Sequence, residues 1–316
     1  MEADKKYFTS DEIRPLARRS NIMGLILILH CYLLIVVALL MFFLWSNFLT
    51  FFLAIVIIGS RQLGLAILMH DAAHRALFAR KSFNDFLGFW VCGCPILADL
   101  FSYRRFHLMH HKYTQTEKDP DKVLSRPFPV TQLSLFRKFL RDLTGQTGVK
   151  LFFRQLLDSY RLAFDKDAIS NSSKQPQTFK ASSLFRPLIS NFFIFIIMGY
   201  LGAWWWWFAF WLLPLFTWFQ IVVRIRNIAE HAATEFTSNE LQNVRTTYAS
   251  PLMRLFVAPY WVNYHLEHHL IMHVPCWRLP KVHELMIKKG YSDQMKLAKS
   301  YLEVFKEVTS KKIVSS

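Results

Sequence analysis

Cysteine is scarce in this chain of 316 residues, which contains four: Cys31, Cys92, Cys94 and Cys276. Their positions form neither a ladder of disulfide pairs nor the paired Cys-x-x-Cys motifs of a zinc site. The first three lie in apolar runs, where a free cysteine usually behaves as a small buried hydrophobic residue. The sequence therefore gives no indication of a disulfide framework or of thiolate ligands for a metal.

Acidic residues are also few, with 22 Asp and Glu against 38 Lys and Arg, so the net charge is +16. Hydrophobic residues nevertheless make up 53% of the chain, and 30 residues are Phe. A soluble core does not need so many aromatic residues, whereas an integral membrane protein with basic cytoplasmic loops explains both facts. We expect one membrane domain over residues 1–316, with a lipid bilayer and no nucleic acid among its partners.

A cleavable signal peptide is not predicted, because the first apolar run begins near Asn21 and is too long for the core of one. Four apolar runs instead predict transmembrane helices in two hairpins, at about 22–45, 48–69, 184–201 and 204–223. A helix over the first run is about 36 Å long, which is enough to cross a bilayer.

The charge pattern predicts the orientation of these spans. The turns within each hairpin lack charges and the long segments are basic, so the positive-inside rule places both termini and the regions 70–183 and 224–316 in the cytoplasm. The apolar stretch 83–100 is short and contains Pro95, and we expect an interfacial or re-entrant segment there. Residues 166–183 are polar and read as a flexible connection. The predicted fold is an all-α, multi-pass integral membrane protein with a helical cytoplasmic cap.

Histidine is abundant and clustered, since nine of the twelve histidines fall in four sets with helical spacing. The sets are His70 and His74; His107, His110 and His111; His231, four residues after Asn227; and His265, His268 and His269. Residues at i, i+3 and i+4 project from one face of a helix. Neutral imidazole is a common ligand for iron, zinc and copper. One set alone could be a solvated patch, but four such sets indicate a metal site.

The composition of these sets favours a catalytic metal over a structural one. A structural zinc site is closed by four ligands that usually include cysteine. Nine histidines can saturate two metal ions and still leave positions for oxygen or water. The paired Glu-x-x-His motifs of soluble di-iron bundles do not occur in the sequence. Nearby carboxylates could orient the rings as hydrogen-bond acceptors, and the candidates are Asp71, Glu230, Glu267, Asp119 and Asp121. For the last two, a solvated loop is an equal alternative.

With its histidine sets in this order between apolar runs, the chain resembles the membrane fatty acid desaturases. Their histidine-box superfamily also contains alkyl hydroxylases and carotenoid ketolases. The resemblance extends from about His70 to Leu279 and includes three boxes and the Asn227-x-x-x-His231 element. It implies a four-span scaffold whose cap holds two iron ions (Fe2+/Fe3+) on the nine histidines, with O2 as co-substrate. It also implies desaturation of an acyl chain, with electrons from a ferredoxin- or cytochrome b5-like donor. We expect Asn227 to reach a metal through a water, as a tenth and weaker position.

Some features depart from known subgroups of the superfamily. Three residues separate His70 from His74, where animal-type acyl-CoA desaturases have four, so the acyl carrier (CoA, carrier protein or glycerolipid) stays open. The third box begins with His265, where front-end desaturases have glutamine. A His-Pro-Gly-Gly haem motif does not occur, so the electron donor is expected to be a separate protein. A hydroxylase or ketolase that acts on a carotenoid or alkyl chain is the alternative, because the same metal centre serves both reactions.

Overall fold

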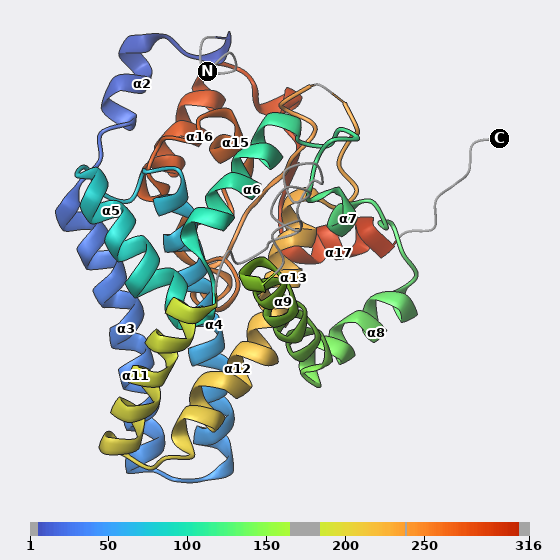
Figure 1. Cartoon of the computed structure of the whole chain (residues 1–316). Helices are drawn as coiled ribbons and strands as arrows, with labels where there is room; N and C mark the ends of the chain where they lie inside the picture. Colours follow the sequence, from blue (N-terminus) through green and yellow to red (C-terminus); the bar gives the residue numbers. More distant parts are fainter. Residues whose placement is uncertain (1–5, 165–183, 238, 310–316) are drawn as a thin grey trace.

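The computed structural model describes residues 6–164, 184–237 and 239–309 (Figure 1). Helices dominate it, and the sheet among these residues is one parallel pair, β1 (Thr246–Thr247) with β2 (Leu297–Ala298). The predicted all-helical class is therefore confirmed in essence. The polar connection expected at 166–183 lies outside the described residues.

Three helices are long and apolar enough to cross a membrane. They are α3 (Asn21–Leu44), α4 (Phe48–Ala73) and a helix over Phe208–His231 that is made of a π-helical turn (Phe208–Leu212), α12 (Leu213–Phe216) and α13 (Trp218–His231). A fourth apolar helix, α11 (Phe185–Leu201), has 17 residues. These helices fit a membrane protein, as the composition predicts, although two bounds differ from the prediction. The second helix continues to Ala73, and the long helix after Trp204 begins only at Phe208.

The α3–α4 hairpin is defined by its polar caps. The Ser20 hydroxyl accepts a hydrogen bond from the backbone N–H of Met23 and starts α3. Asn47 and Thr50 form a reciprocal capping box that starts α4 after a turn of three residues. Side-chain caps satisfy N–H groups that a helix start leaves unpaired. The first two long apolar helices are therefore joined by a minimal turn, as predicted.

The apolar stretch 83–100 does not form a straight helix. It runs through α5 (Lys81–Leu87), a π-helical turn (Gly88–Gly93) and a 3-10 turn (Cys94–Ile96), and α6 (Leu100–Tyr113) then leaves at 95°. The bend is tied to the second hairpin, because Trp211 donates to the Pro95 carbonyl oxygen at 2.9 Å and Asn191 to that of Cys94 at 3.0 Å. The bend agrees with the expectation of an interfacial or re-entrant segment.

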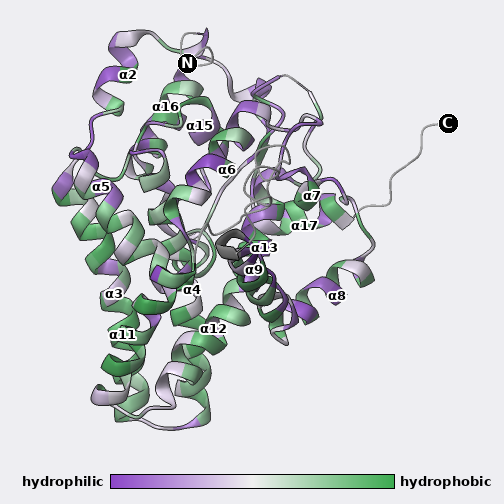
Figure 2. Ribbon diagram, viewed as in Figure 1, coloured by the Kyte–Doolittle hydropathy of each residue, from purple (hydrophilic) through white to green (hydrophobic). Residues whose placement is uncertain are grey.

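Several of the remaining helices gather at one end of the molecule, around α6, while α3, α11 and α12 extend away from them and α8 and α9 lie beside α12 and α13 (Figure 1). Figure 2 shows the extended end as mainly hydrophobic and the region around α6 and α7 as mixed and more hydrophilic. The remaining helices are α2 (Ser10–Leu16), α7 (Lys122–Ser125), α8 (Gln132–Leu143), α9 (Gln146–Phe164), α14 (Pro251–Phe256), α15 (His265–Leu270), α16 (Leu279–Lys288) and α17 (Tyr301–Thr309), with 3-10 turns at Pro259–Trp261, Cys276–Arg278 and Ser292–Gln294.

Arg61, the one charge in the second apolar run, is 2% exposed in the structure. Its guanidinium donates to the backbone carbonyl of Leu255 in α14. The protein itself therefore supplies the partner of this charge. Helix α14 thus covers α4 at Arg61, within the apolar run.

Candidate metal centre

The ends of four helices bring all nine histidines of the predicted sets together. They come from α4, α6, α13 and α15. Arg104 of α6 fixes α4 against α6, because its Nε and Nη2 donate to the carbonyl oxygens of Ala73 and Ala72 at 2.8 and 2.9 Å. A cation at these carbonyls also favours the helix C-terminus electrostatically. The first and second histidine sets are therefore held in one rigid arrangement.

The histidines divide into two clusters, within each of which the candidate ligand atoms lie within 4.8 Å of one another. The first contains His70, His74, His107, His111 and His268, and the second contains His110, His231, His265 and His269. The clusters are adjacent, since the rings of His111 and His269 stack with centroids 4.2 Å apart. The arrangement offers two neighbouring metal positions with five and four imidazoles.

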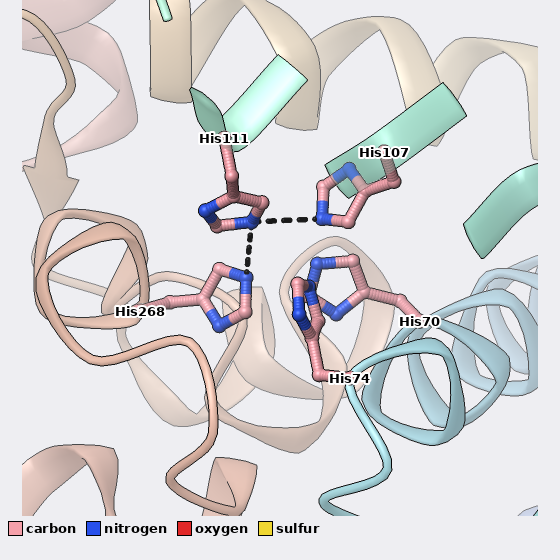
Figure 3. Close-up of side chains that lie close together, drawn as sticks. All are labelled: His70, His74, His107, His111 and His268. Atoms are coloured by element: carbon pink, nitrogen blue, oxygen red, sulfur yellow. Dashed lines mark hydrogen bonds between the residues drawn. The ribbon is translucent and has the colours of Figure 1, made fainter. Parts of the chain in front are cut away.

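The first cluster converges on a common point, as Figure 3 shows. His111 Nε2 lies 3.0 Å from Nε2 of His107 and 3.0 Å from Nε2 of His268. The rings of His70 and His74 enter from α4 on the other side. Two nitrogens bound at about 2.1 Å to one ion at a right angle are about 3.0 Å apart. The spacing is therefore that of ligands around a single metal ion.

The second cluster has the same spacing. His265 Nε2 lies 2.9 Å from His231 Nε2 and 3.0 Å from His269 Nε2. His110 approaches from α6, and its ring centroid is 4.7 Å from that of His231. Elements far apart in the sequence thus supply one ligand shell.

Helical geometry explains how one set serves both clusters. Residues at i and i+4 are about 40° apart around a helix, whereas i+3 lies about 60° to the other side. In α6 the i, i+4 pair His107 and His111 joins the first cluster, and His110 joins the second. In α15 the pair His265 and His269 joins the second cluster, and His268 joins the first. The spacing H-x-x-H-H is therefore suited to a ligand set shared between two ions.

Several ring nitrogens support metal binding because they are buried without a hydrogen-bond partner among the described residues. They are both nitrogens of His70 and of His74, Nε2 of His110 and Nδ1 of His231. A buried polar atom without a partner is costly, and such atoms are rare in native structures. The unpaired nitrogens of His70, His74 and His110 fit a bound metal ion, whereas His231 faces its cluster through Nε2.

The electrostatics of the site favour neutral imidazole, which is the form that binds metals. Burial, together with the nearby positive charge of Arg104, lowers the pKa of His74 to about 3. Burial also holds the pKa of His265, His268 and His269 well below the ordinary value, with neighbouring histidines as the next cause. These rings stay uncharged at neutral pH and can offer a lone pair.

Asp119 lies where the sequence predicts a carboxylate that orients a ligand. Its Oδ1 accepts a hydrogen bond of 2.8 Å from Nδ1 of His110, and its Oδ2 accepts one of 2.9 Å from the backbone N–H of Gln115. Asp119 is buried, not solvated. Asp121 stands further away, with Oδ2 at 3.9 Å from the same ring nitrogen. The bond to Asp119 leaves Nε2 of His110 directed at the second cluster.

The carboxylates that adjoin a histidine in sequence have other partners. Asp71 accepts from the backbone N–H of Cys276 at 2.9 Å, and the distance from its Oδ1 to His70 Nδ1 is 3.8 Å. Glu267 accepts hydrogen bonds from Nδ1 of His283 at 2.6 Å and from the Thr246 hydroxyl at 2.5 Å. Both side chains tie the histidine-bearing helices to neighbouring segments.

Glu230 points one oxygen at the second cluster. Its Oε1 accepts from Arg226 Nε at 2.7 Å, and its Oε2 lies 3.5 Å from His265 Nε2, the nitrogen that faces His231 and His269. Asn227 lies on the same helix, one turn before His231, and is half-buried. Within the part of the chain that the structure describes, its amide makes no hydrogen bond. Its contact with a metal through water stays a prediction.

Sequence reasoning missed several residues that support the ligands. Thr114 Oγ1 lies 3.3 Å from Nδ1 of His269, and Gln115 Nε2 donates to the His231 carbonyl oxygen at 2.9 Å. His283, the partner of Glu267, is buried on α16. Thr114 and Gln115 follow directly after the second histidine set, and this position is the one signal that could have indicated them. His283 has no histidine at helical spacing, so no pattern in the sequence marks it.

Comparison with known proteins agrees with this geometry. The sequence pattern of the family described as fatty acid desaturase matches residues 44–298, which include all nine clustered histidines. The chain belongs to the fatty acid desaturase family, and it is an oxidoreductase. Proteins of this family generally carry two iron ions and act on lipid substrates in membranes.

Two named relatives are similar over most of their length. The chain is 28% identical over 292 residues to the dihydrorhizobitoxine desaturase of Bradyrhizobium elkanii. The matched region covers 89% of this chain and 79% of that protein. It is 26% identical over 310 residues to the sn-1 oleoyl-lipid 12-desaturase of a Picosynechococcus strain. This matched region covers 94% of this chain and 84% of that protein. Both relatives are named as desaturases.

Replacing Asp119 by asparagine is expected to weaken metal retention by about 10- to 100-fold, as the loss of an outer hydrogen-bond partner usually does. The amide has nearly the same shape but no charge to polarise the His110 ring. Metal affinity measured by competition with a chelator checks this prediction. Asp11→Asn, at an exposed acid of α2, is the control. Equal affinity in the two variants would mean that Asp119 only closes the loop at Gln115.

Proposed function

We propose that the protein is a membrane-bound, O2-dependent fatty acyl desaturase that introduces a carbon–carbon double bond. The observation that supports this most directly is the pair of adjacent clusters, with five and four imidazoles at ligand spacing. Two iron ions held there would supply the oxygen activation that breaks C–H bonds of an unactivated acyl chain. Imidazole ligation without cysteine is consistent with iron, although imidazole also accepts other metals.

The protein groups have distinct tasks in this proposal. The nine histidines hold the two ions, and Asp119 keeps His110 in the tautomer whose Nε2 faces the second ion. Seven of the nine histidines are at most 8% exposed, and the other two, His111 and His269, are half-buried, so bulk water is largely kept from the site. Glu230 places one carboxylate oxygen at the edge of the second cluster and holds the other on Arg226. This oxygen is placed to accept a hydrogen bond from water at the second ion.

The proposed topology has four spans in two hairpins, with both termini and the metal site on the cytoplasmic side. The second hairpin would consist of α11 and the helix that begins at Phe208, which lie at the same end of the molecule as the α3–α4 turn (Figure 1). The uncharged turns and the basic long segments support this orientation. A separate ferredoxin- or cytochrome b5-like protein would deliver the electrons to the cytoplasmic face.

The substrate we propose is an acyl chain on a membrane lipid or a thioester. One relative is named for an oleoyl group on a lipid, which supports a lipid-linked chain as the first substrate to test. The other relative is named for dihydrorhizobitoxine, so family membership alone does not define the substrate.

Expression in a host that supplies an electron donor is expected to yield an unsaturated acyl chain that the host does not otherwise make. Gas chromatography with mass spectrometry of total fatty acids identifies the product and the position of its double bond. The matched control is His268→Ala, which removes a ligand from the first cluster. An oxygenated carotenoid or alkyl product in place of a new double bond would contradict the proposal and favour a hydroxylase or ketolase.

A further inference from the structure

Helices α8 and α9 form a hairpin that the metal site does not use. It follows the second histidine set in the sequence and packs beside the junction of α12 and α13. The Thr131 hydroxyl caps the start of α8, and Gly145, in a left-handed conformation with φ of 77°, makes the turn to α9. Each helix shows three different faces, and one of them is apolar and uncovered.

On α8, the uncovered apolar face consists of four residues at helical spacing that are 45–62% exposed: Leu133, Phe136, Leu140 and Leu143. A second face is buried against the protein and carries Leu135 and Asp142. Arg137 and Arg141 are exposed on the third face. At about 100° per residue, Phe136 and Arg141 point in directions about 140° apart.

Helix α9 repeats this arrangement. Its uncovered apolar face carries Val149, Phe153, Leu156 and Leu157, which are 39–57% exposed; Tyr160 is exposed on the same side, and Leu151 is exposed elsewhere on the helix. Gly148 and Phe152 face the protein, while Lys150, Arg154 and Arg161 are exposed on the opposite side. The two helices therefore present apolar faces and basic faces side by side.

The hairpin is firmly attached to the end of a candidate membrane span. A Cβ atom at Gly148 would lie 2.6 Å from the Phe216 Cα, so only glycine allows this approach of α9 to α12. Asp142 is fully buried and accepts a hydrogen bond of 2.9 Å from Arg224 Nη2. Phe216 lies inside the apolar run and Arg224 directly follows its end at Val223. The attachment thus sits at the depth where that helix passes from apolar to charged surroundings.

We propose that α8 and α9 lie in the plane of the bilayer surface, with their apolar faces among the acyl chains and their basic faces on anionic lipid headgroups. Exposed apolar surface of this extent marks an interaction site. A helix with a large apolar face and a basic face is typical of interfacial binding. Residues 132–161 contain six basic and two acidic residues, and one of the acids, Asp142, is buried in its ion pair with Arg224. This charge fits an anionic lipid surface.

Continuity with the candidate spans favours lipid over a soluble partner as the occupant of this surface. The hairpin packs on the apolar helix itself, so its uncovered apolar face adjoins the surface that α12 offers to lipid. By binding at the bilayer surface, the hairpin would then fix the distance of the metal-binding end from the membrane. This inference does not depend on the reaction that the metal centre performs.

Spin labels can test the proposal on the full-length protein in vesicles of phosphatidylcholine, with and without phosphatidylglycerol. Labels are attached at Phe136→Cys and Phe153→Cys on the apolar faces, and at Arg141→Cys and Arg154→Cys on the basic faces as matched controls. The four native cysteines are buried, which limits their labelling. Collision rates are measured with O2, which is concentrated in lipid, and with a water-soluble nickel chelate.

The labels at Phe136 and Phe153 are expected to collide more with O2 than with the nickel chelate, and those at Arg141 and Arg154 to show the reverse. Phosphatidylglycerol should increase the O2 preference of the apolar labels, and high salt should remove this increase by screening. Preferential nickel collisions at Phe136 and Phe153 would mean that they face water. Low collisions with both reagents would mean that protein covers them. Either result would overturn the proposal, and a lack of response to phosphatidylglycerol would overturn its headgroup part.

Discussion

Replacing His111 or His265 by alanine is expected to weaken metal binding severely and to abolish the proposed desaturation. Each residue lies in the middle of its cluster, with Nε2 within 2.9–3.0 Å of two other ring nitrogens. Alanine removes a ligand and leaves a buried gap that no neighbouring side chain can fill with a nitrogen. The loss should exceed the factor of about 10 to 100 that an outer partner contributes to metal affinity or activity. Iron per chain should fall from about two to one or fewer, as elemental analysis of purified protein can show.

His30→Ala is the matched control for these two variants. His30 is an exposed histidine outside both clusters, and its Nδ1 lies 3.2 Å from the hydroxyl oxygen of Tyr260. This variant should keep its iron and its activity, because the substitution removes an imidazole without touching the metal shell. If His111→Ala and His265→Ala also keep full iron and activity, the nitrogens of the clusters are not the ligands.

The gathering of nine histidines could be predicted from the sequence, but their division between two clusters could not. Helical spacing shows that His107, His110 and His111 share one face of a helix. Which of them meets His70 and which meets His231 depends on how α4, α6, α13 and α15 cross, and this is a tertiary property. In the structure, His110 joins the second cluster although His107 and His111 join the first. His268 joins the first cluster although His265 and His269 join the second.

The supporting carboxylates show that closeness to a histidine in the sequence does not predict contact with that histidine in the structure. Successive residues of a helix point about 100° apart, so an acid directly beside a ligand histidine is turned away from that ring. Glu267 precedes His268 but reaches His283, and Asp71 follows His70 but reaches the backbone of Cys276. Asp119 lies in a loop nine residues after His110 and can fold back onto it. The contact between Asp119 and His110 forms because the chain turns back after α6, and not because the two residues are neighbours in the sequence.

The long apolar helices were easier to predict than the broken ones. Runs such as 22–45 and 48–69 are continuous and uniform, and the structure has helices over both. The run at 204–223 contains Pro214, which cannot continue an ordinary helical hydrogen-bond pattern. There the structure has a π-helical turn, a short helix and non-helical backbone angles at Thr217 (φ −117°, ψ −86°), and regular helix resumes only at Trp218. Hydropathy measures how apolar a segment is, but it does not show where the backbone departs from a regular α-helix.

Asn227 is the remaining candidate that the ligand clusters leave unassigned. It lies one helical turn before His231 on α13, on the same face and half-buried. The first cluster has five imidazoles and the second has four, so an ion in the second cluster would have more room for a further weak ligand. In the proposed arrangement this ligand would be a water, and the Asn227 side-chain carbonyl would accept a hydrogen bond from it without adding a charge. Glu230, whose Oε2 lies at the edge of the same cluster, could share that water.

Asn227→Ala is therefore expected to fold and keep most of its iron, yet to lose activity by about 100-fold, the upper range for an outer partner. His231→Ala, one turn further along α13, should instead lose iron, since it removes a ligand nitrogen. Asn227→Asp keeps an oxygen at the same place and should restore part of the activity. Iron content, circular dichroism and turnover measured on the three variants separate these effects. Wild-type turnover in Asn227→Ala would show that the side chain serves only the packing at the end of the helix.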